Sequence, residues 1–156
     1  LGVRFVPGGQ LIGPVPALPA TDLLAGLAAQ SEARLRLALI PLLLVRPELS
    51  AAIPDTLTRL STREQGTLKL FYTAAVILQQ GHAEALQSLL GEYDLLPDRF
   101  ATELEIAMAG DWLPRLKQLM EHHRAGGGLA VNWEGPYRHA ADRLLRQLSL
   151  EAQWSR

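Results

Sequence analysis

The chain of 156 residues is long enough to form one domain with a substantial core. Its 48% hydrophobic and 20% charged residues are typical of a folded globule and exclude an intrinsically disordered chain. The formal net charge of -1 lacks the positive excess expected of a nucleic-acid-binding protein, so we expect no nucleic-acid partner. Because cysteine is absent, a disulfide framework, a thiolate metal site and a cysteine nucleophile are excluded, and we expect a reducing, cytoplasmic location.

The sequence also predicts that the chain does not cross a membrane. A spanning helix needs about 18 or more consecutive apolar residues. The closest candidate, residues 37–45, is shorter and contains Pro41, so we interpret it as a core element. The chain begins with Leu1 rather than Met and goes straight into apparent structure, which predicts that processing removed residues or that it is part of a longer protein.

The first 20 residues predict a β-hairpin followed by a proline-rich connector. Val3–Val6 and Gln10–Ile12 are short apolar runs separated by a Pro-Gly-Gly turn. Prolines at 14, 16 and 19 then favour an extended connector. We therefore assign residues 1–20 to this hairpin and connector, and residues 21–156 to a single helical domain.

The helical domain should begin with three short helices. Thr21-Asp22 provides the start of the first helix. The second is predicted over Glu32–Arg46, where Pro41 lacks an amide and should kink or split it. A third short helix, Pro54–Leu60, should lead into the central one.

The stretch Thr62–Gln80 predicts a buried central helix. Ser61 and Glu64 form the capping-box pattern that starts a helix, with each side chain satisfying a backbone amide of the other. The residues after this start are apolar on nearly every side, so the helix must be covered on most of its surface. We expect Leu39 and Phe71 to lie in the same core.

The C-terminal half predicts further helices of ordinary length. The predicted ranges are His82–Gly91, a helix opened by Pro97 whose inner face carries Phe100, Leu104 and Met108, then Asp111–Arg124, and finally Tyr137–Gln153. Glycines 126–128 should end the penultimate helix, and Leu129–Trp133 should be a short extended piece. The fold class is therefore predicted to be all-α: a helical bundle of about six to seven helices with a small N-terminal β-hairpin.

One segment resembles a DNA-binding motif. Leu60–Glu64, continued by Thr67–Leu70, is similar to the start of the helix-turn-helix of sigma-factor region 4 and LuxR-type regulators. That resemblance implies a recognition helix in the major groove. Here, however, the helix continues through the apolar residues 73–78 without a turn or a cation, so we favour a capped core helix.

A second resemblance concerns Arg115 and His122. HEPN-type ribonucleases carry an arginine followed a few residues later by a histidine on a helix of an all-α bundle of similar size. The resemblance implies metal-independent RNA cleavage, in which Arg115 positions the phosphate and His122 moves a proton. Leu116 stands where the family usually has a polar residue. A HEPN-like ribonuclease, or an inactive relative, is our alternative function.

No metal or cofactor site is expected from the remaining polar residues. The histidines at 82, 122, 123 and 139 lack the spacing of a metal motif, since adjacent residues point about 100° apart on a helix. Gly126–Gly128 lacks the lysine of a phosphate-binding loop and the spacing of a dinucleotide loop.

The segment between residues 132 and 139 is the best candidate for an interaction site. It contains Trp133, Tyr137, Arg138 and His139, and aromatic residues and arginine are the types that anchor protein interfaces. The alternative is that Trp133 and Tyr137 close the end of the bundle. With no convincing catalytic set, the sequence favours a non-enzymatic helical interaction or regulatory module, part of a larger protein or assembly, which binds a protein partner or associates with itself.

Overall fold

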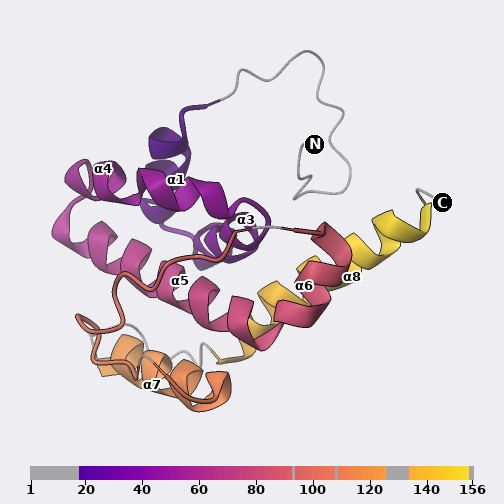
Figure 1. The fold of residues 1–156 in the computed structure, drawn as a ribbon. Helices are drawn as coiled ribbons and strands as arrows, with labels where there is room; N and C mark the ends of the chain where they lie inside the picture. The colour runs from indigo at the N-terminus through magenta and orange to yellow at the C-terminus, as the bar shows by residue number, and fades with distance from the viewer. Residues whose placement is uncertain (1–17, 93, 108, 126–133, 155–156) are drawn as a thin grey trace.

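The computed structural model describes residues 18–92, 94–107, 109–125 and 134–154 (Figure 1). Within these ranges the regular elements are all helical, which confirms the predicted all-α class. The predicted hairpin and the extended piece Leu129–Trp133 lie outside the described residues.

The helices follow one another with short connections. Their bounds are α1 Ala20–Ala28, α2 Ala33–Arg36, α3 Leu39–Val45, the 3-10 helix η1 Pro47–Ala52, α4 Ile53–Thr58, α5 Thr62–Gly81, α6 Ala83–Leu90, α7 Trp112–Ala125 and α8 Glu134–Trp154. Most agree closely with the predicted ranges. The last helix starts earlier than Tyr137, and the segment before α4 adds a 3-10 turn.

Helix α5 is the centre of the fold, as the sequence predicts. Its N-terminus carries the complete capping box, in which the Glu64 amide donates to the Ser61 hydroxyl and the Ser61 amide donates to the Glu64 carboxylate. Every residue from Phe71 to Gln79 is buried. Helices α3 and α7 make its most extensive contacts, and α1, α6 and α8 also touch it (Figure 1). Leu39 and Phe71 are both buried in the same core, as expected.

The helix expected over Glu32–Arg46 is split, but the break comes before the proline. α2 ends at Arg36 and α3 begins at Leu39, so Pro41 is the third residue of α3. The first four amides of a helix have no acceptor within it, and a residue without an amide therefore loses no hydrogen bond there. The proline thus fixes where a new helix can start.

The helix predicted from Pro97 is absent, and this prediction was wrong. Residues 94–107 follow an irregular path with one helical turn near Phe100. Glu105 ends that turn with φ of 55°, and the Ile106 amide donates to the Ala101 carbonyl at 2.8 Å. This pattern is a Schellman motif, which stops a helix and satisfies its last carbonyl groups.

Side chains of α5 hold this irregular segment in place. Gln79, which is buried, accepts a hydrogen bond from the Leu96 amide at 2.8 Å and donates to the Asp94 carbonyl. The Tyr72 hydroxyl donates to the Pro97 carbonyl at 2.8 Å. Because α5 satisfies these backbone groups, the segment does not need to form a helix to be buried.

No single helix among the described ranges is long and apolar enough to cross a membrane. One pair, Ala33–Val45 with Pro47–Thr58, passes the length and composition test only when taken together, and it is bent by 115°. Leucines and isoleucines of both helices lie in the core, and α3 packs against α5.

Gly81, at the end of α5, permits a close approach of Trp112 from α7. A methyl group at position 81 would lie 2.5–2.9 Å from atoms of the indole ring. Gly81→Ala should therefore lower the free energy of unfolding by about 1–3 kcal/mol through overpacking, measured by urea denaturation.

Gly66 on the same helix provides the matched control. An added methyl group there meets no atom within 4 Å. Gly66→Ala should raise stability by about 0.5–1 kcal/mol, because alanine is the better helix former. Equal effects of the two substitutions would contradict the close contact between Gly81 and Trp112.

Candidate functional site

A cluster of polar groups surrounds the buried side chain of Arg115. This side chain is only 2% exposed, and its guanidinium donates to the Asp98 carboxylate at 2.9 Å, to the Gln80 side chain and to the Ala107 carbonyl. The cluster joins α7, α5 and the irregular segment 94–107. A planar guanidinium suits this role because its donors point in several fixed directions at once.

The hydrogen bonds of Arg115 determine whether it could act with His122 as the ribonuclease alternative requires. His122 is exposed on the same helix, whereas the Arg115 guanidinium is buried and donates to Asp98, Gln80 and Ala107. The structure therefore does not bring Arg115 and His122 together at a surface where both could contact one phosphate. In this arrangement Arg115 positions neighbouring segments.

Tyr137, predicted as an interaction residue, lies in the core. It is fully buried, and its hydroxyl shares a hydrogen bond of 2.9 Å with His123 Nδ1. The Phe71 ring meets the Tyr137 ring edge-on at 5.4 Å between centroids. Burial raises the pKa of the Tyr137 hydroxyl well above its ordinary value. Tyr137 therefore packs α8 against α5 and α7.

Two partly buried histidines should make stability depend on pH. Burial lowers the pKa of His123, and the charge of Arg36 lowers it further. Burial also lowers the pKa of His82, with Arg138 acting in the same direction and Asp142 opposing. The unfolded chain therefore binds more protons than the folded chain as the pH falls through about 6.5.

The free energy of unfolding should consequently decrease on acidification from about pH 7.5 to about pH 5.5. Urea denaturation at the two pH values measures this change, and a His82→Gln/His123→Gln variant should lose part of it. An unchanged pH dependence in the variant would show that other groups are responsible.

The other predicted interaction residues have different surroundings. Trp133 lies outside the described residues. Arg138 and His139 are both exposed on the first half of α8, and Arg138 lies near enough to His82 to influence its pKa. Only Arg138 and His139 of the predicted set are therefore shown at the surface.

A continuous exposed face runs along α8 from His139 to its end. His139, Arg143, Arg146, Leu150 and Trp154 recur at intervals of three or four residues, so they lie on one side of the helix. We call these five residues the outer face of α8. The opposite side carries the buried residues Tyr137, Ala141 and Leu144.

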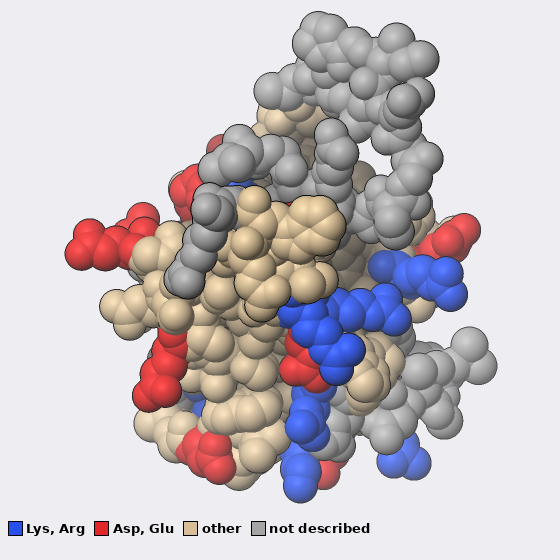
Figure 2. Space-filling view, turned by 90° about the vertical axis from the view of Figure 1, so that its right-hand side faces the viewer, with Lys and Arg blue, Asp and Glu red and all other residues tan. Residues whose placement is uncertain are grey.

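The apolar end of this face is unusually exposed. Leu150 is 55% exposed and Trp154 is 87% exposed, and the end of α8 extends away from the other helices (Figure 1). Figure 2 views the molecule from the side toward which α8 extends, and Lys and Arg side chains gather there in a column. Leu150 and Trp154 were not among the site residues predicted from the sequence. They can be recognised as apolar residues that lie off the buried side of α8, which carries Tyr137, Ala141 and Leu144.

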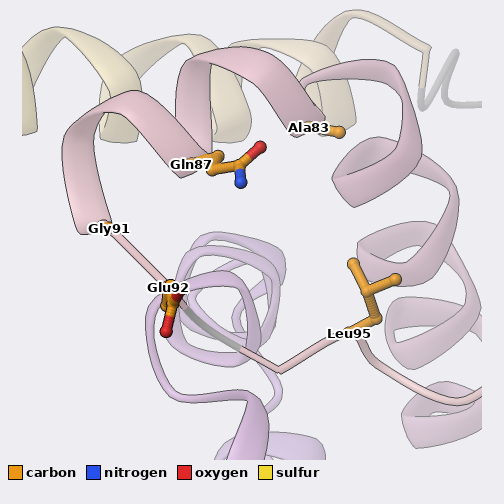
Figure 3. Close-up of a pocket in the computed structure, with 5 residues that line it drawn as sticks. All are labelled: Ala83, Gln87, Gly91, Glu92 and Leu95. Carbon is orange, nitrogen blue, oxygen red and sulfur yellow. The ribbon is translucent and has the colours of Figure 1, made fainter.

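A cleft of about 490 Å³ lies beside α6. Figure 3 shows the residues that line it, which come from α6 and the segment after it: Ala83, Gln87, Gly91, Glu92 and Leu95. We call this the α6 cleft. Leu95 is 71% exposed, and residues 83–95 contain three acidic residues and no lysine or arginine. The α6 cleft therefore combines an exposed apolar side chain with negative charge.

Within the described ranges no group of three or more histidine, aspartate or glutamate side chains could hold a metal ion. Comparison of the chain with protein-family models, with curated proteins and with solved structures finds no match.

Proposed function

We propose that the chain is a non-enzymatic helical interaction module that works within a larger protein or assembly and binds a protein through the outer face of α8. One observation carries this proposal: Trp154 is 87% exposed, and Leu150 is exposed one turn before it. Tryptophan is usually well buried, and an exposed apolar cluster commonly marks an interaction site. Arg143 and Arg146 beside it add the other residue type that dominates interface energies.

The remaining parts of the molecule act as a support for this face. Tyr137, Ala141 and Leu144 anchor the first half of α8 in the core, so the outer face is presented on a fixed helix. A recognition surface on a rigid helix loses less conformational entropy on binding than a loop does. The lack of cysteine suits a reducing compartment, and the cytoplasm is part of the proposal.

The ribonuclease alternative has weaker support. Its two residues would have to meet at one phosphate, but Arg115 is buried and its guanidinium is already bonded to Asp98, Gln80 and Ala107. We therefore keep the interaction module as the single proposed function.

The proposal is tested by comparing the proteins recovered with the wild-type chain and with a Leu150→Ser/Trp154→Ser variant from the cells that express it. At least one protein should be recovered in a stoichiometric amount with the wild type and lost with the variant. Leu35→Ser is the matched control, because Leu35 is also exposed on a helix but lies on α2.

Recovery of that protein should be unaffected by Leu35→Ser. Identical recoveries with the wild type and the α8 variant would contradict the proposal. Circular dichroism should be the same for all three proteins, because both substituted α8 residues are exposed.

A further inference from the structure

Two surfaces at the same end of the molecule each expose apolar side chains, and their charges are opposite. We infer that the partner of the outer face of α8 is a second copy of this chain, whose α6 cleft receives Trp154. The inference rests on the proposed function and names the partner for the same face.

The apolar groups of the two surfaces fit this arrangement. Trp154 and Leu150 are exposed on α8, and Leu95 is exposed at the α6 cleft. The cleft volume of about 490 Å³ falls within the range of about 300–1,000 Å³ that is usual for binding pockets. It has room for an indole ring, which on binding would cover the exposed Leu95 side chain. Contact between the two copies would thus remove exposed apolar surface from both.

The charges of the two surfaces are opposite. The outer face of α8 carries Arg143 and Arg146, whereas Glu92 lines the cleft and Glu84 and Asp94 are exposed near it. Complementary charges at an interface favour the correct partner and speed association. Pairing two outer faces of α8 would instead join two surfaces that both carry arginines and no acidic residue. The charge pattern therefore favours the α6 cleft as the receiving surface.

The positions of the two surfaces favour a closed dimer. Helices α6 and α8 contact each other within one chain, and they lie together at one end of the molecule (Figure 1). Each copy could then offer α8 to the other and receive α8 in return, as the two-fold symmetry of most homodimers requires. In such a dimer the outer face of α8 and the α6 cleft of each copy would both be covered by the other copy.

Sedimentation velocity of the purified full chain over a wide concentration range tests the inference. The wild type should form a dimer, and its dissociation should become more extensive at high salt, which screens the exposed charges. Trp154→Ala should weaken the dimer roughly 30-fold or more, as expected for a tryptophan at the centre of an interface.

Charge reversal provides a sharper test of which surfaces meet. Arg146→Glu and Glu92→Arg should each weaken the dimer roughly tenfold or more, because each places like charges in contact. The double variant restores opposite charges between copies and should recover most of the wild-type affinity. Lys117→Glu, an exposed change on α7, should leave the dimer unaltered.

A chain that remains monomeric at every concentration would overturn the inference. So would a dimer that is insensitive to Trp154→Ala, or a double variant as weak as the two single ones. The chain could also prove monomeric while a different protein is recovered with the wild type and not with Leu150→Ser/Trp154→Ser. That result would assign the outer face of α8 to a different partner. That result would leave the proposed function standing, so the two failures are distinguishable.

Discussion

Replacing Arg115 with alanine should lower the free energy of unfolding by about 3–5 kcal/mol, the usual effect of removing one member of a buried ion pair. The substitution leaves the Asp98 carboxylate, the Gln80 side chain and the Ala107 carbonyl without the guanidinium that they share. Asp98 is 17% exposed and can recover some hydration, which favours the lower end of this range. Urea denaturation would show a lower midpoint.

Arg115→Lys separates the charge from the geometry. Lysine keeps the positive charge near Asp98, but it cannot donate in the three directions that the guanidinium uses. We expect Arg115→Lys to lower the free energy of unfolding, but by less than Arg115→Ala does. A loss below about 1 kcal/mol for Arg115→Ala would mean that the cluster is open to water, and that Arg115 is available at the surface after all.

Truncating Leu39 should have the second large effect. Leu39 is fully buried at the start of α3, and α3 packs along the central helix α5. Leu39→Ala should lower the free energy of unfolding by about 2–5 kcal/mol through lost burial and the cavity left behind. Against a typical total stability of about 5–15 kcal/mol this is a large fraction.

Leu35→Ala is the comparison for this substitution. Leu35 lies on α2 only a few residues earlier and is 43% exposed. Its truncation should change stability by less than about 0.5 kcal/mol. Similar effects at the two positions would indicate that α3 is not packed against α5 as described.

Local chemistry explains which parts of the fold could be predicted from the sequence. The Ser61–Glu64 capping box lies within four consecutive residues, and the apolar run after it can be buried only in the middle of a bundle. Helix α7 likewise begins beside Asp111, whose carboxylate accepts a hydrogen bond from the Leu113 amide. These elements are determined by residues close in the sequence, and their prediction succeeded for that reason.

The segment 94–107 shows why other parts could not be predicted. Phe100 and Leu104 are both buried at helical spacing, yet they occupy a single turn that ends at Glu105. The path of the segment depends on hydrogen bonds with the side chains of Gln79, which accepts from the Leu96 amide, and Tyr72, which donates to the Pro97 carbonyl; both are distant in the sequence. Periodicity alone contains no information about such tertiary partners.

The predicted site residues differ in burial, which their local sequence does not determine. The residue types at Tyr137 and Arg115 suggested functional roles, but their burial is a property of the packed helices rather than of their neighbours in the sequence. Leu150 and Trp154 were recognisable only as apolar residues out of phase with the buried stripe of α8. The exposure of each side chain in the folded protein therefore assigns Tyr137 and Arg115 to the interior, and Leu150 and Trp154 to a candidate binding surface.

A photo-crosslinking amino acid at position 150 would test the central claim, that the outer face of α8 contacts another protein. Irradiation of cells that express this variant should give one discrete crosslinked product, with the mass of two chains if the partner is a second copy. The same amino acid at position 35 should give none. The absence of a product from position 150, or an equal yield from both positions, would contradict the claim.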